Sequence, residues 1–255
     1  AQYQNARANS ISTNVQLLLA QEQLSEYIGS YQDKLAVLRS DFNFQKPYPA
    51  ELNDWLSLAQ QKNLKIQQAR LQQKYSEDQR RVEKAALYPQ IDAVASYGYT
   101  KQTPETLIST DGKFDQVGVE MNWNLFNGGR TRTSIKKATV EASKAQAQLD
   151  AAIRRANVDV KSAFMQVDTD QAKLEARKAA MDSSSLVSQA SKASYNEGLK
   201  SMVDVLLAQR NAFSAKQDYL NAQYDYLLNV LRLKAAVGQL GEKDLVELNS
   251  WLTYQ

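Results

Sequence analysis

The 255-residue sequence contains no cysteine and no histidine. Without cysteine, the chain has no disulfide framework, no thiolate nucleophile and no thiolate metal ligand. Without histidine, it lacks the usual general base near neutral pH and the commonest metal ligand of proteins. It also has only nine glycines and four prolines, which are few turn residues for a loop-rich fold. We therefore expect no enzymatic activity, no cofactor and no metal site.

Neither sign of charge dominates, and long apolar runs are missing. The 31 basic and 28 acidic residues leave a net charge of +3, so nucleic acid is not an expected partner. No run of about 18 apolar residues occurs, so no single helix is predicted to span a bilayer. The first residues lack the pattern of a signal peptide and resemble the interior of a helix. We expect a mature or truncated piece of a longer protein.

The hydrophobic content of 43% is that of a folded protein, and the first part of the chain predicts helices. Segment 1–39 predicts a terminal helix that ends near Gly29 or shortly beyond. Segment 40–49 is a linker, because two prolines two residues apart interrupt both helix and sheet. Segment 50–88 predicts two short amphipathic helices, over 51–62 and from 64 to about 87, and Pro89 must stop the second.

Segment 89–127 shows the alternation of apolar and polar residues that is typical of β-strands. It predicts strands over 91–100 and 117–126, joined by a polar loop over 101–114. About ten residues is the length of a tilted transmembrane barrel strand, and aromatic residues near the strand ends fit an interfacial girdle. An ordinary soluble hairpin is the alternative. In a barrel, the lipid-facing residues of the second strand would be Val117, Val119, Met121, Trp123 and Leu125.

Segment 128–239 predicts a pair of long helices. From about Arg130 to Ala193 there is neither proline nor glycine, which allows a helix of roughly 95 Å. A turn near 195–201 separates it from a second helix that runs from Met202 to about Val237. Segment 240–255 follows as a short C-terminal segment.

Apolar residues recur every seven positions in both long helices. The first helix has one such seam, formed by Ile153, Val160, Val167, Leu174 and Met181. The second helix has two adjacent seams: Leu206, Phe213, Leu220 and Leu227 form one, and Val205, Ala212, Tyr219 and Tyr226 form the other. Two seams predict neighbours on both sides, as in a ring of helices. An ordinary antiparallel bundle fits the pattern equally well.

An internal repeat supports the ring. The residues that lead to Gly29 match those that lead to Gly238, and Leu35–Leu38 then corresponds to Leu245–Leu248 with one residue inserted. Segment 1–39 is thus interpreted as the end of one repeat, and segment 50–255 as a complete second repeat.

The most distinctive stretch of the chain is Tyr195-Asn-Glu-Gly-Leu-Lys-Ser-Met-Val-Asp-Val-Leu206. Asn211–Lys216, Tyr226–Asn229 and Lys234–Gly238 continue this pattern, and Trp123-Asn-Leu-Phe-Asn-Gly-Gly129 precedes the first long helix. With these residues the chain resembles, over essentially its whole length, the TolC family of outer-membrane efflux channels. It departs from the family at Asn124, where a proline is common.

The resemblance implies a mostly α fold with a β-hairpin. Long antiparallel helices would form a periplasmic α-barrel tunnel, and the strands would contribute to a transmembrane β-barrel shared by a homotrimer. A family protomer supplies four strands, whereas this chain predicts two. Either the first half is missing, or six half-length chains would close the ring.

The resemblance also implies a gate at the helical tip, where Tyr195, Lys200 and Asp204 match the family's tip residues. Lys200 stands where a basic residue makes closing links, and Asp204 matches an aspartate that faces the pore. The family's second aspartate falls on Leu207, which predicts a weaker acidic ring. For Asp204 a local role is also open, because Ser201 and Asp204 have the spacing of a helix capping box. For Tyr195 the alternative is a helix-end aromatic packed on its neighbour.

Four cations open the first long helix: Arg130, Arg132, Lys136 and Lys137, here called the basic cluster. Cations at this end oppose the helix dipole, so lipid head groups would be a compensating contact. A plain solvated face is the alternative.

These features predict a passive outer-membrane channel protomer, with a periplasmic helical extension, that gives drugs or secreted proteins an exit duct. The implied partners are outer-membrane lipid, a periplasmic adaptor and an inner-membrane pump of the RND or ABC class. One rival is a soluble coiled-coil scaffold, which leaves the alternating strands unexplained. Another is an enzyme that uses acidic pairs such as Asp168 and Asp170.

Overall fold

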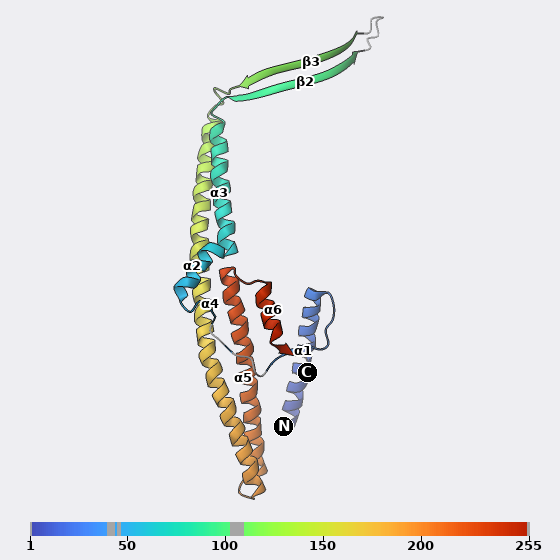
Figure 1. Ribbon diagram of the computed structural model, residues 1–255, viewed down its shortest axis with the longest axis vertical. Helices are drawn as coiled ribbons and strands as arrows, with labels where there is room; N and C mark the ends of the chain where they lie inside the picture. The colour runs from blue at the N-terminus through green and yellow to red at the C-terminus, as the bar shows by residue number, and fades with distance from the viewer. Residues whose placement is uncertain (1, 40–43, 45–46, 103–109, 254–255) are drawn as a thin grey trace. The chain divides into compact units, whose positions relative to one another are not determined.

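The computed structural model describes residues 2–39, 44, 47–102 and 110–253 (Figure 1). The chain forms two compact units. One unit comprises residues 1–48 and 240–255, and the other comprises residues 49–239. The terminal segments 1–39 and 240–255, which are predicted as separate segments, thus belong to one unit.

The terminal unit contains α1 (Gln2–Ile28), β1 (Val37–Leu38), α6 (Glu242–Ser250) and β4 (Leu252–Thr253). β1 and β4 pair antiparallel, with Val37 opposite Thr253. The backbone N–H of Arg39 extends this contact to the carbonyl of Trp251 at 3.0 Å. The guanidinium of Arg39 lies 5.7 Å from the centroid of the Trp251 ring, a cation–π contact.

The two glycines at which the predicted repeat matches have the same role in the structure. Gly29 and Gly238 both end long helices with positive φ, 71° and 81°, which glycine adopts without a steric penalty. Beyond them the proposed match is wrong, because Val37–Leu38 is a strand whereas the segment 245–248 lies inside α6. α6 begins there because the Asp244 carboxylate accepts a hydrogen bond from the Gly241 N–H at its N-terminus, 2.9 Å away.

The described residues of the larger unit form four helices: α2 (Leu52–Lys62), α3 (Leu64–Ala85), α4 (Arg130–Asn196) and α5 (Met202–Val237). α4 has 67 residues, about 100 Å at 1.5 Å per residue, as the absence of proline and glycine predicts. α3 packs along its N-terminal part and α5 along its C-terminal part (Figure 1). Among the described residues, no helix combines the length and the hydropathy that crossing a membrane requires.

The predicted seam of α4 is the contact with α5. Val160, Val167 and Leu174 are buried there. On α5 the buried residues Val205 and Tyr226 belong to one of the two predicted seams, and Ala208 is buried one turn after Val205. Each buried valine or leucine contributes about 1.5–3 kcal/mol relative to an exposed side chain, so this seam stabilises the helix pair.

Asn63 joins three helix ends. Its backbone N–H donates to the carbonyl of Ala59 at the end of α2, at 2.9 Å. Its side-chain oxygen accepts from the N–H of Ile66 in the first turn of α3, at 3.0 Å, and its side-chain nitrogen donates to the carbonyl of Ala236 in the last turn of α5, at 2.6 Å. Gly238 is required beside this joint, because a Cβ at that position would collide with the carbonyl oxygen of Lys62.

β2 (Gln90–Gln102) and β3 (Thr110–Asn122) form an antiparallel hairpin in which Ala95 lies opposite Val117. The predicted loop over 101–114 is therefore too long, because β2 and β3 remain paired as far as Gln102 and Thr110. Polar residues do not end the pairing, since the hydrogen bonds between strands are made by backbone groups. The remaining positions, 103–109, lie outside the described residues. β3 ends at Asn122 rather than at residue 126, because the next partner would be Pro89, which has no N–H to donate.

The two faces of the hairpin differ in polarity. One face carries the apolar pairs Ile91–Met121, Ala93–Val119 and Ala95–Val117. The opposite face carries the polar pairs Asp92–Glu120 and Ser96–Gln116. The predicted alternation is thus confirmed in register from the Ile91–Met121 pair to the Ser96–Gln116 pair, whereas nearer the loop Asp115 lies on the apolar face and Phe114 on the polar face.

The joint at Asn63 yields a first prediction. Asn63→Ala removes the α3 cap and the bond to Ala236, and should lower the free energy of unfolding by about 2 kcal/mol. Asn63→Asp keeps a cap acceptor but sets a carboxylate oxygen against the Ala236 carbonyl, and should also destabilise. Chemical denaturation of the full chain in detergent measures both losses.

Gln68→Ala, at an exposed position of the same helix, serves as the control and should stay within about 0.5 kcal/mol of the parent. An Asn63→Asp variant as stable as the parent would show that the bond to Ala236 contributes nothing.

Candidate gate at the helical tip

The turn between α4 and α5 is closed by backbone hydrogen bonds of the C-terminal turn of α4. Gly198, with φ of 76°, donates its N–H to the carbonyl of Tyr195 at 2.9 Å. The N–H of Leu199 donates to the carbonyl of Ser194 at 2.8 Å. Glycine fits this left-handed position at the end of a helix, and the chain then reverses into α5. The turn lies where the sequence predicts it.

Asp204 takes part in the capping box that its spacing from Ser201 predicts. The Ser201 hydroxyl accepts from the Asp204 N–H at 3.3 Å, and the Asp204 carboxylate accepts from the Ser201 N–H at 3.0 Å. The Ser201 hydroxyl also donates to the same carboxylate oxygen at 2.7 Å. The local role of Asp204 is therefore confirmed, and its carboxylate remains solvent-exposed.

The side-chain and backbone hydrogen bonds from Ser201 hold the pKa of Asp204 below its ordinary value of 3.8, and the nearby Lys200 acts in the same direction. Because the pKa is lower in the folded chain, the stabilisation from this ionised cap is complete above the ordinary pKa. It is lost as the pH falls through the lowered pKa. The cap thus carries its full negative charge near neutral pH.

Lys200 is engaged within its own chain. Its ammonium donates to the hydroxyl of Ser191 at 3.0 Å, and Ser191 is buried on the last part of α4. Tyr195 lies one turn further along α4, partly exposed. The structure thus places Tyr195 in the last turn of α4, Lys200 in the connecting turn and Asp204 in the first turn of α5. Sequence reasoning missed Ser191, since a serine within a helix carries no signal for a lysine nine residues away.

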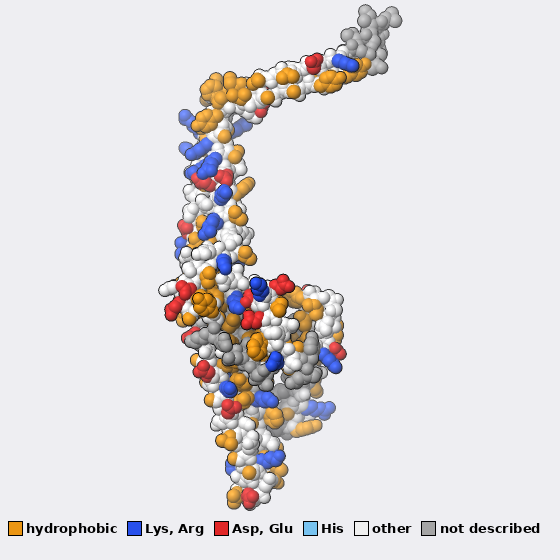
Figure 2. All heavy atoms as spheres, in the orientation of Figure 1, with side chains coloured by type: hydrophobic (Ala, Val, Ile, Leu, Met, Phe, Trp, Pro, Cys, Tyr) orange, Lys and Arg blue, Asp and Glu red, His pale blue; other side chains and the backbone are white. Residues whose placement is uncertain are grey.

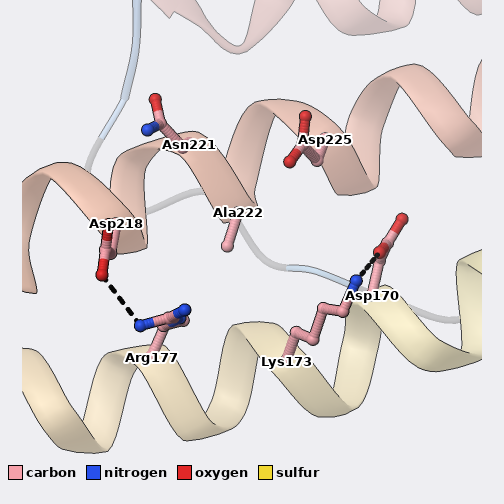
Figure 3. A pocket seen from close by; sticks show the side chains of 7 residues that line it. All are labelled: Asp170, Lys173, Arg177, Asp218, Asn221, Ala222 and Asp225. Carbon is pink, nitrogen blue, oxygen red and sulfur yellow. Dashed lines mark hydrogen bonds and ion pairs between the residues drawn. The ribbon is translucent and has the colours of Figure 1, made fainter.

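Sequence reasoning also missed a polar cluster between α4 and α5 (Figure 3). Asp170 is buried, and its carboxylate accepts from the Asn229 amide at 2.5 Å and from the Gln166 amide at 2.7 Å. The Lys173 ammonium lies 3.5 Å from the same carboxylate. From the sequence, Asp170 is named only as one of an acidic pair with Asp168. Its position three residues after Val167 places it beside the seam, and this spacing is the signal for the cluster.

The same cluster includes an ion pair across the two helices, between Arg177 and Asp218 at 2.8 Å. These side chains line a cleft of about 240 Å³ with Asn221, Ala222 and Asp225. Of the three carboxylates that line the cleft, Asp170 is hydrogen-bonded and Asp218 is paired with Arg177. Because the bonds from Asp170 to Asn229 and from Arg177 to Asp218 join the two helices, they fix the register of α4 against α5. Within the described ranges, no group of three or more acidic side chains is placed to hold a metal ion.

The strand residues named from the sequence are all exposed, but they do not all belong to β3. Val117, Val119 and Met121 lie in β3 on the apolar face. Trp123 and Leu125 follow the strand, which corrects their assignment as strand residues. The Trp123 ring nitrogen donates to the carbonyl of Leu87 at 3.3 Å. This bond joins the segment that precedes β2 to the segment that follows β3.

Comparisons with known proteins match the whole chain. Outer membrane protein TolC of Escherichia coli (strain K12) is 32% identical over 263 residues, which cover 99% of this chain and 53% of that protein. Alkaline protease secretion protein AprF of Pseudomonas aeruginosa is 27% identical over 247 residues, which cover 96% of this chain and 51% of that protein. The chain spans about half the length of these curated relatives.

Solved structures share the fold. The open state of the Neisseria gonorrhoeae MtrE outer membrane channel has a TM-score of 0.74 at 18% identity, over 93% of this chain and 54% of that chain. The family described as "Outer membrane efflux protein" matches residues 55–239. That range contains the hairpin, both long helices and the tip, and the chain belongs to this outer membrane efflux protein family.

Proposed function

We propose that this chain forms part of a homotrimeric outer-membrane channel that gives drugs or secreted proteins an exit duct. The observation that carries the proposal is an unused apolar seam on α5. Leu206, Phe213 and Leu220 repeat every seven residues and are exposed. In the adjacent seam Val205 and Tyr226 are buried, and Ala212 and Tyr219 are half-buried. A seam of this length requires a second helix to cover it.

The other helices repeat this arrangement. On α4, Val158, Met165 and Leu186 are exposed at multiples of seven residues, on the side away from the buried Val160 and Val167. On α3, exposed apolar residues recur on the side away from α4, namely Leu64, Leu71, Tyr75 and Val82. Helices with apolar stripes on two sides fit a closed ring in which every helix has two neighbours, the proposed periplasmic tunnel.

The hairpin would supply strands to a transmembrane β-barrel shared by the protomers. Its apolar face would contact lipid and its polar face would line the interior, the alternation that such barrels show. Relatives support the setting: TolC is named an outer membrane protein, AprF a protein of alkaline protease secretion, and SrpC of Pseudomonas putida part of a solvent efflux pump. A periplasmic adaptor and an inner-membrane pump would then supply energy and select substrates.

The tip would form the gate. Asp204 of each protomer would face the pore axis, where neighbouring carboxylates attract cations. Lys200 would hold the tip closed from within its own protomer through Ser191, and Tyr195 would pack at the end of α4. The duct would be passive, since this assignment gives no residue a catalytic role. A soluble scaffold would instead be extracted without detergent.

The exposed seam provides the test of assembly. Phe213 is 73% exposed, and Phe213→Glu places a charge in the proposed interface between protomers. The detergent-extracted parent should have the mass of a trimer by light scattering, and Phe213→Glu should dissociate it. Asn211→Glu, at an exposed position on the other flank of α5, is the matched control and should remain assembled. A parent that is monomeric and melts cooperatively would contradict the ring.

The hairpin predicts a dependence on depth in the membrane. Val117 lies near the middle of β3, so Val117→Arg should cost about 2–4 kcal/mol of stability in lipid vesicles, whereas Met121→Arg at the strand end should cost about 0–1 kcal/mol. Gln116→Arg, on the polar face beside Val117, is the control. Urea titration in vesicles measures all three, and equal losses would rule out a lipid-facing apolar side.

The gate predicts a cation block that can be separated from helix capping. Asp204→Ala should abolish block by a multivalent cation in planar-bilayer recordings, because it removes the charge. Ser201→Ala should keep the block while the cap loses about 1 kcal/mol. The block should persist at pH 5 and disappear as the pH falls below 3.8, since the pKa of Asp204 is lowered. If Asp204→Ala is blocked like the parent, the residue is a helix cap only.

A further inference from the structure

The ends of α3 and α4 that adjoin the hairpin carry an excess of positive charge. From Lys84 to Ile91, and again from Trp123 to Val140, the sequence has no acidic residue. These two stretches contain five cations, the basic cluster and Lys84. All five side chains are exposed, and Figure 2 shows basic side chains gathered on this part of α3 and α4.

None of these five cations forms an ion pair with any described residue of the chain. Other cations of α4 do: Lys144 lies 3.7 Å from Glu141, Arg155 lies 3.3 Å from Asp159, and Arg177 lies 2.8 Å from Asp218. α4 also has no acidic residue in its first turn. Like charges placed together without counter-ions repel one another, so this arrangement is unfavourable unless an external anion compensates it.

A second feature identifies where that anion would be. Between the cations and the hairpin lies an apolar collar of five exposed residues: Leu87, Tyr88, Trp123, Leu125 and Phe126. Aromatic residues of this kind concentrate where a membrane meets water. The chain order is therefore apolar hairpin face, then collar, then cations, which is the order of the layers of a bilayer from its core outward.

The dimensions agree with this order. The polar head-group layer on each side of a bilayer is roughly 5–8 Å thick. Arg130 and Lys137 are seven residues apart, about 10 Å along the helix, and long basic side chains reach toward the interface. The four cations of the basic cluster thus fall within reach of one head-group layer.

We propose that the basic cluster and Lys84 bind the phosphate groups of anionic phospholipids in the leaflet nearest the helical part. This rests on the proposed function, because it requires the hairpin to lie in a membrane. The cations would set the depth of the hairpin and enrich anionic lipid around the protein. Each Lys or Arg near an anionic surface contributes about fivefold to binding, so four independent contributions multiply to several hundredfold. Removing the four should therefore reduce the lipid preference by well over about tenfold.

Trp123 supplies a reporter at the site itself. Trp55 is fully buried in α2, and Trp251→Phe removes the remaining tryptophan, so lipid-dependent quenching would come from Trp123. The full chain would be reconstituted in phosphatidylcholine bilayers that contain either dibromo-phosphatidylglycerol or dibromo-phosphatidylcholine. The ratio of the two quenching curves gives the preference for the anionic lipid.

The test compares two variants with the same change in net charge. Arg130→Gln, Arg132→Gln, Lys136→Gln and Lys137→Gln together neutralise the basic cluster and should reduce the preference by more than about tenfold, with Lys84 left to account for what remains. Arg154→Gln, Lys161→Gln, Lys178→Gln and Lys192→Gln together neutralise four other exposed cations of α4 and should leave the parent's preference unchanged.

Three outcomes would overturn the proposal. A parent without preference, or two variants with equal preference, would mean that the cations are merely solvated. Loss of the preference in millimolar inorganic phosphate, at constant ionic strength, would mean that the site binds free phosphate. If neither brominated lipid quenches Trp123, the residue does not lie in the membrane, which would contradict the proposed function as well. The first two outcomes leave the proposed function intact.

Discussion

The larger unit depends on the three hydrogen bonds of Asn63, which hold the ends of α2, α3 and α5 at one point. Helix ends leave N–H and carbonyl groups without partners, and here one buried side chain satisfies groups from two helices while its backbone satisfies a third. Because α5 ends where α3 begins, the two together cover the length of α4. The single long helix thereby gains a packing partner along almost all of its length, and the hairpin and the tip lie at its opposite ends.

The apolar stripes of the helices show how such a support becomes part of something larger. A monomer would place its best hydrophobic residues in its own core, yet Phe213, Met165 and Leu71 remain exposed at regular intervals. The buried Asp170 and its partner Asn229 lie beside the shared seam, where a polar pair fixes register rather than adding stability. Exposed seams with fixed register are suited to association with further helices.

The sequence alone predicts the elements whose cause is local or periodic. Heptads and the absence of proline predict α4 and α5, Pro89 limits α3, and the spacing of Ser201 and Asp204 predicts the capping box. Contacts between distant residues were beyond its reach: the two-residue pairing of Val37 with Thr253, the bond from Lys200 to Ser191, and the joint at Asn63. Asn63 did carry a signal, since it precedes an apolar helix as an N-cap, but nothing local indicates that its amide reaches α5.

The seven-residue spacing of the exposed stripes also determines handedness. A straight α-helix drifts by about 20° per heptad relative to a seven-residue repeat. From Val158 to Leu186 there are four such intervals, so the stripe would turn by about 80° around a straight α4. A neighbouring helix can follow it from end to end only if both wind around each other in a left-handed supercoil. The spacing of the apolar residues therefore determines the twist of any assembly that forms on this surface.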